Sequence, residues 1–116
     1  MPVNASIEKH PDGCAVVVFT GQITLGSSLS LVDSQIRSLI SSGAGKIVFD
    51  LAAVDFVDSA GLGMLIYANG SLKSKGGALR VCGVVPRVQS LLELTKMDTV
   101  LAIDATREES LAALGA

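Results

Sequence analysis

The stretch KIVFDLAAVDFVDSAGLGML, Lys46 to Leu65, carries the signals of a strand followed by a helix. Its first six residues, Lys46 to Leu51, are a short apolar run that predicts a buried strand. After a short loop, Asp58 has the side chain and the position of a helix N-cap. Gly61 and Gly63 then fall in the first turn of that helix, where each glycine costs about 1 kcal/mol relative to alanine. A turn that accepts this cost is a candidate functional site.

Strand and helix signals alternate on both sides of this stretch. Residues 5–21 predict a hairpin whose turn is PDG, Pro11 to Gly13. The other predicted elements are a helix from a cap at Ser27 or Ser28 to Ile40, ended by Gly43 and Gly45, a helix from Asp58 to Lys75, a strand in 78–84, a helix from Pro86, a strand in 99–103, and a last helix capped by Thr106 and Glu109. This order predicts one α/β domain, residues 1–116, with a mixed, mostly parallel sheet, an N-terminal hairpin and about four helices.

The composition limits the classes of partner. Hydrophobic residues make up 49% of the chain, aromatic residues only 3%, and the net charge is -2. A weakly acidic chain that is poor in aromatic residues is a poor candidate for direct binding to nucleic acid or to an anionic membrane. No apolar run approaches the roughly 20 residues of a membrane span, and the N-terminus does not have the pattern of a signal peptide. We therefore expect a cytoplasmic protein.

The two cysteines, Cys14 and Cys82, both lie in apolar, strand-like runs. This placement predicts buried, reduced thiols. A single histidine and the lack of a Cys-x-x-Cys pair argue against a metal site. We expect neither a metal nor another cofactor.

The turn at Asp58 has chemistry of its own. Ser59 falls at the first helical position, with its hydroxyl free to face solvent. The N-terminus of a helix favours a phosphate, whereas the carboxylate of Asp58 would repel one, so a phosphate on Ser59 would change what this surface binds. Gly61 and Gly63 would let another protein approach Ser59 closely. Alternatively, Asp58 is an ordinary N-cap and the two glycines serve helix–sheet packing.

The residues from Val48 to Ile103, which include DSAGLG, a Gly-Gly pair before the next strand and LLELT, resemble the STAS domain of bacterial anti-sigma factor antagonists. The similarity extends over almost the whole chain. It implies that Ser59 is phosphorylated by a partner that is both an anti-sigma factor and a serine kinase. The unphosphorylated form would bind that partner and free a sigma factor, and a metal-dependent serine phosphatase would reset the switch.

The resemblance also implies that ATP is bound by the kinase and that the antagonist is not an enzyme and has no catalytic residues. We expect a partner-binding surface around the phosphorylation site. Its predicted members are Thr24 in the loop 21–24, Asp58, Gly61, Leu62, Gly63 and Met64. Met64 is included because it lies off the predicted buried face of its helix, although a place in the core is an equal alternative.

Two positions depart from the family pattern. Thr24 stands where an acidic residue is common, so it can still form a hydrogen bond but lacks the charge. Lys96 replaces a glycine that is frequent after the helix containing LLELT. We expect the change at Lys96 to affect local capping more than function.

Two other functions were considered. The chain could be a STAS interaction module that acts without phosphorylation in another signalling or transport complex. It could also be an enzyme with Ser59 as nucleophile and His10 as base, but the nucleophile elbow of hydrolases requires Gly-x-Ser-x-Gly and residue 57 is a valine. We also expect His10 to be exposed at the hairpin turn.

Overall fold

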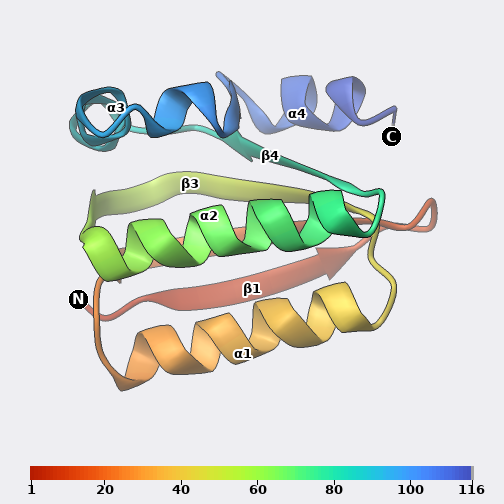
Figure 1. Cartoon of the computed structure of the whole chain (residues 1–116), viewed down its shortest axis with the longest axis horizontal. Coiled ribbons are helices and arrows are strands. Elements are labelled where there is room, and N and C mark those ends of the chain that lie inside the picture. The colour runs from red at the N-terminus through yellow and green to blue at the C-terminus, as the bar shows by residue number, and fades with distance from the viewer. Residues whose placement is uncertain (116) are drawn as a thin grey trace.

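The computed structural model describes residues 1–115, and its centre is a single five-stranded sheet (Figure 1). The strands are β1 (Asn4–Lys9), β2 (Cys14–Ile23), β3 (Lys46–Val57), β4 (Ala78–Cys82) and β5 (Ala102–Asp104), and they lie in this order across the sheet. β1 pairs antiparallel with β2, and all other neighbours are parallel. The predicted hairpin and mostly parallel sheet are confirmed.

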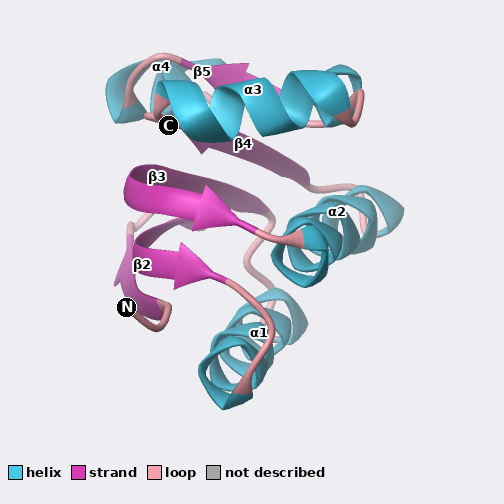
Figure 2. Ribbon diagram, turned by 90° about the vertical axis from the view of Figure 1, so that its left-hand side faces the viewer, coloured by secondary structure: helices cyan, strands magenta, loops and turns pink. Residues whose placement is uncertain are grey.

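Helices connect the parallel strands and cover the sheet. They are α1 (Ser27–Ser41), α2 (Ser59–Ser74), α3 (Pro86–Leu94) and α4 (Arg107–Ala113), with a short 3-10 turn, η1 (Met97–Thr99), after α3. α1 and α2 lie side by side on one face of the sheet, whereas α3 and α4 lie toward its β4–β5 side (Figure 2). No helix within residues 1–115 is long and apolar enough to cross a membrane.

The core is mainly aliphatic, as the composition requires. Its largest members include Phe19 and Phe49, whose rings meet edge to face with centroids 5.0 Å apart. A smaller cluster of Val16, Val48 and Cys82 is covered by Leu111 and Leu114 at the C-terminal end of the chain. Both cysteines are buried and free, as predicted, and burial raises the pKa of the Cys82 thiol to about 11.

β3 is much longer than predicted. The sequence predicts a strand that ends at Leu51 and a loop before Asp58, but the strand runs unbroken to Val57. The second half of β3 pairs with the end of β2, where two register shifts let Ile23 come opposite Val57. Val54 and Val57 are buried in the main core. This pairing stabilises a strand that the local sequence does not signal, and it carries the chain directly into α2.

Smaller differences concern the ends of elements. The N-cap of α1 is Gly26 rather than Ser27 or Ser28, because both serines already lie inside the helix and Gly26 supplies the first carbonyl acceptor, to the N–H of Ser30. The predicted strand in 99–103 begins only at Ala102, since Thr99 belongs to η1. At α4, Thr106 is the N-cap and its hydroxyl oxygen accepts a hydrogen bond from the N–H of Glu109 (3.1 Å), as predicted.

Lys96 is the only residue other than glycine in residues 1–115 with a positive φ, 63°. Because a left-handed conformation strains a residue with a Cβ by about 1–2 kcal/mol, Lys96→Gly is expected to stabilise the fold. The greater freedom of glycine in the unfolded chain offsets part of this gain, so we expect a net increase of about 0.5–1 kcal/mol in the free energy of unfolding. Urea unfolding of both proteins measures it; a less stable Lys96→Gly variant would show that the lysine side chain stabilises this turn.

Candidate functional site

The turns that follow β2 and β3 meet at the carboxyl ends of these two strands. In Figure 2 the two arrowheads lie side by side and lead into α1 and α2. Asp58 links the turns. Its Oδ1 accepts a hydrogen bond from the N–H of Gly61 (2.8 Å), and its Oδ2 accepts one from the N–H of Leu25 (2.9 Å). The N–H of Asp58 donates to the carbonyl of Ile23 (3.2 Å). The predicted N-cap therefore also fixes the loop that contains Thr24.

Ser59 is the first residue of α2 and is exposed. At this position its side chain lies beside the unpaired N–H groups and the positive end of the helix dipole. Such a helix end accepts an anion without disturbing the backbone. Each oxygen of the neighbouring Asp58 carboxylate accepts a hydrogen bond from one backbone N–H. Because these donors are uncharged, the carboxylate keeps its negative charge beside any group attached to Ser59.

The two glycines of the turn have different roles. Gly61 is buried, and a Cβ built on it would overlap the backbone carbonyl of Ile23 in β2. The structure thus favours the packing alternative for Gly61 over a place on open surface, because α2 approaches β2 backbone to backbone at this point. Gly63 is exposed, and a Cβ built there would meet no atom within 4 Å. Only Gly63 leaves open surface beside Ser59.

For Met64 the structure favours the second of the two alternatives, a place in the core, since only 6% of the residue is exposed. It follows Gly61 by three residues and precedes Ala68 by four, and it joins them on the buried side of α2. The apolar face of α2 is therefore wide, because the helix packs against α1 as well as against the sheet. Met64 belongs to the core, with one edge on a groove between the two helices.

Thr24 and Leu62 are both half-buried, and the structure brings Thr24 to the same end of the sheet as Ser59. Leu25 is a site residue that the sequence does not predict, and it is 80% exposed although it is a leucine. A leucine in a short loop gives no sequence signal of exposure. Leu25 becomes a candidate only because its N–H donates a hydrogen bond to the carboxylate of Asp58, which is 33 residues away.

Hollows flank the start of α2 on both sides. The α1–α2 groove, with a volume of about 360 Å³, is lined by Leu25, Ala60, Gly63, Met64, Tyr67 and Arg37 among others. On the other side, a smaller apolar hollow of about 220 Å³ lies between the end of β3 and α3, with Phe56 and Leu91 in its wall. The guanidinium of Arg87 lies over the Phe56 ring, 5.0 Å from its centroid. Ser59 thus stands at the start of α2 between two hollows, one shared by α1 and α2 and one formed by β3 and α3.

Comparison with known proteins identifies the family of this domain. Residues 5–110 match the model of the STAS domain. The chain belongs to the STAS domain family. A curated relative, the anti-sigma F factor antagonist of Paenibacillus polymyxa, is 30% identical over 103 residues, which cover 87% of each chain. The family that the sequence resembles, that of the anti-sigma factor antagonists, is thereby confirmed.

Solved structures show the same fold. A crystal structure of an anti-sigma factor antagonist from Mycobacterium paratuberculosis superposes with a TM-score of 0.85 at 24% identity and covers 98% of this chain and 95% of that one. The Bacillus cell fate determinant SpoIIAA in its phosphorylated form superposes with a TM-score of 0.74 at 18% identity, with 95% and 98% covered. The five-stranded sheet and four helices are thus the STAS fold.

The STAS fold separates Ser59 from His10. His10 precedes β2 and Ser59 follows β3, and these two strands are parallel along Cys14–Ile23 and Lys46–Val57. The residues therefore lie at opposite ends of the sheet, about 30 Å apart, because the ten residues of β2 are joined by nine steps of about 3.3 Å each. Ser59 and His10 cannot form a nucleophile–base pair.

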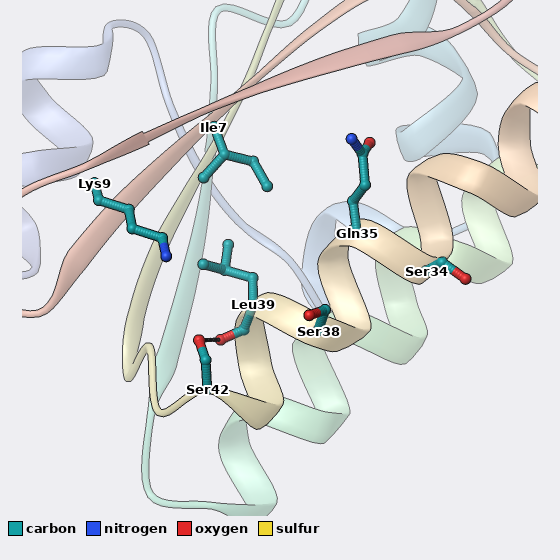
Figure 3. Close-up of a pocket in the computed structure, with 7 residues that line it drawn as sticks. All are labelled: Ile7, Lys9, Ser34, Gln35, Ser38, Leu39 and Ser42. Atoms are coloured by element: carbon teal, nitrogen blue, oxygen red, sulfur yellow. Dashed lines mark hydrogen bonds between the residues drawn. The ribbon is translucent and has the colours of Figure 1, made fainter.

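A further hollow of this STAS domain, of about 420 Å³, lies between β1 and α1 (Figure 3). Ile7 and Leu39 form its apolar part, and the hydroxyl of Ser42 is occupied by a hydrogen bond to the carbonyl of Leu39 (2.8 Å). Lys9, the last residue of β1, lies beside it. Ser42 and Lys9 belong to the end of the sheet opposite Ser59, so this hollow is not part of the candidate site.

The pKa of the Asp58 carboxyl is held below its usual value by hydrogen bonds from the backbone N–H groups of Leu25 and then Gly61. A lowered folded-state pKa gives stability that is present above the unfolded pKa of about 3.9 and is lost as the pH falls through the folded pKa. Asp58→Ala is therefore expected to cost about 1–2 kcal/mol near neutral pH and less near pH 3. Urea unfolding of both proteins at the two pH values tests this; a difference independent of pH would exclude the carboxylate as its cause.

Proposed function

We propose that this STAS domain is an anti-sigma factor antagonist switched by phosphorylation of Ser59. Its unphosphorylated form would bind an anti-sigma factor that is also a serine kinase, which frees a sigma factor, and phosphorylation would end that complex. The observation that carries the proposal is the exposed Ser59 at the first position of α2, directly after the carboxylate that caps the helix. The relative from Paenibacillus polymyxa, an anti-sigma F factor antagonist by name, supports the choice of partner.

The physical basis of the switch is a large local change in charge. A phosphoserine carries about -1.5 to -2 charges near neutral pH. The helix N-terminus stabilises this charge, so the phosphorylated domain keeps its fold. A partner surface that fits the neutral hydroxyl would instead meet a dianion next to Asp58. Bringing unpaired or like charges together in an interface costs several kcal/mol, which is enough to dissociate the complex.

In the proposed cycle the domain is a substrate and a ligand. The kinase holds ATP, the Oγ of Ser59 forms a bond to the γ-phosphorus as the bond from that phosphorus to the leaving ADP breaks, and the hydroxyl proton is released. A metal-dependent serine phosphatase would return the hydroxyl by hydrolysis. Under this proposal the domain needs no cofactor or metal of its own, does not bind nucleic acid or membrane directly, and acts in the cytoplasm.

Intact-mass spectrometry tests the proposed modification. The domain is incubated with ATP and the serine kinase encoded beside its gene, or otherwise each such kinase of the same cell, with Ser59→Ala as control. We expect one added phosphate on the native domain and none on the variant. Binding without any phosphate would contradict the switch and indicate a STAS module that acts without phosphorylation. A phosphate retained in Ser59→Ala would assign the modification to another residue.

A further inference from the structure

The α1–α2 groove begins at the Ser59 turn and carries side chains that the phosphorylation switch does not use. At the end of the groove near Ser59, Leu25 is 80% exposed, and the hydrogen bond from its N–H to the Asp58 carboxylate holds it in place. Ala60 follows Ser59 directly and lines the same groove. Any protein surface seated on Ser59 therefore lies at the mouth of this groove, and the groove continues that contact surface along α2.

The near end of the groove is shaped for an apolar side chain. Gly63 leaves open space in its wall, since a Cβ built there would meet nothing within 4 Å, and one edge of Met64 forms apolar floor. Leu25 stands exposed at the rim. Burying an aliphatic side chain against these groups would remove the exposed surface of Leu25 from water, which favours association.

The far end of the groove is polar and contains an ion pair, because Asp33 and Arg37 both line it. The guanidinium of Arg37 lies over the ring of Tyr67, 4.1 Å from its centroid, and its Nε donates to Asp33 (2.8 Å). Tyr67 is 51% exposed. Stacking and the ion pair fix the plane of the guanidinium, and its terminal nitrogens carry further N–H donors in a fixed geometry. Such a guanidinium is suited to donate hydrogen bonds to a carboxylate of another chain.

We propose that the α1–α2 groove takes a segment of the anti-sigma factor that places an apolar side chain between Leu25 and Gly63 and a carboxylate on Arg37. Gly63 and Tyr67 are four residues apart on α2, so the two contacts are separated by about 6 Å along the helix axis. A helix of the partner would present the apolar side chain and the carboxylate from positions about one turn apart. This inference rests on the proposed function, and it adds the chemistry by which the partner is recognised.

The experiment measures binding of the anti-sigma factor by calorimetry with two variants and two matched controls. Gly63→Leu fills the near end, and its control is Gly70→Leu, another exposed glycine of α2 with open space around it. Arg37→Glu reverses the charge at the far end, and its control is Lys73→Glu, which makes the same change of charge at an exposed lysine in the last turn of α2. Circular dichroism confirms that each variant is folded.

We expect at least tenfold weaker binding for Gly63→Leu and for Arg37→Glu, and binding within twofold of the native domain for both controls. Native-like affinity of the two groove variants, with the native domain binding well, would overturn this inference and leave the proposed function intact. Equal losses in variants and controls would overturn it too, because the effect would not belong to the groove. If the native domain neither binds nor is phosphorylated by any serine kinase of its cell, the proposed function itself fails.

Discussion

Gly61→Ala is expected to lower the free energy of unfolding by about 2–3 kcal/mol, the upper part of the range for overpacking a well-packed core. The added Cβ would overlap the backbone carbonyl of Ile23. The Cγ2 atom of the Ile23 side chain also lies only 2.7 Å from the position of the added Cβ. A backbone carbonyl in a paired strand cannot move aside unless β2 or α2 moves with it. The better helix propensity of alanine, worth about 1 kcal/mol, offsets only part of this cost.

Gly63→Ala is the matched control, two residues along the same helix. Because its Cβ would meet nothing within 4 Å, only the gain in helix propensity remains, and we expect a stabilisation of about 0.5–1 kcal/mol. Urea unfolding of the native domain and both variants measures the two changes. Opposite signs are the expected result. Similar effects at the two positions would contradict the backbone-to-backbone approach of α2 and β2.

Ser59→Glu is expected to weaken binding of the anti-sigma factor at least 100-fold. The substitution puts a permanent negative charge at the start of α2, beside Asp58, where the partner is proposed to meet a neutral hydroxyl. Like or unpaired charges in an interface cost several kcal/mol, and about 2.7 kcal/mol corresponds to this factor. Calorimetric titration of the native and variant domains gives the two affinities.

Ser59→Ala separates charge from shape in the same experiment. It removes the hydroxyl without adding charge, so its affinity is expected to stay within a few-fold of the native value. The glutamate variant is also expected to keep the native stability within about 0.5 kcal/mol, because an acidic side chain is favourable in the first turn of a helix. Equal binding by Ser59→Glu and Ser59→Ala would mean that charge at this position does not control the complex.

Much of the fold follows from local patterns in the sequence. The N-cap role of Asp58, the first-turn proline of α3 at Pro86 and the capping of α4 by Thr106 all depend on residues within one helical turn, and the structure confirms each of them. The alternation of strands and helices depends on composition over short windows and is also confirmed. Ser59 was located in the same way, from its place directly after a cap.

The errors concern contacts between distant parts of the chain. β3 extends to Val57 because it pairs with the end of β2, and Gly61 and Met64 are buried because α2 packs against β2 and α1. None of these partners lies near in the sequence.

Several ion pairs also join residues that are distant in the sequence, and no sequence motif predicts them. Arg107 at the start of α4 pairs with Asp50 (3.1 Å) and with Glu8 (3.0 Å), 57 and 99 residues away. Arg80 pairs with Asp104 through two hydrogen bonds of 2.7 and 3.0 Å. These ion pairs connect the C-terminal helix and the last strand to the rest of the sheet.

The most direct test of the central claim compares one preparation of the domain in two states. The domain is phosphorylated to completion at Ser59, its affinity for the anti-sigma factor is measured, and the measurement is repeated after a metal-dependent serine phosphatase has removed the phosphate. The account predicts weak or undetectable binding in the first state and full recovery of affinity in the second. Equal affinity in the two states would contradict it, because the charge on Ser59 would then not govern the complex.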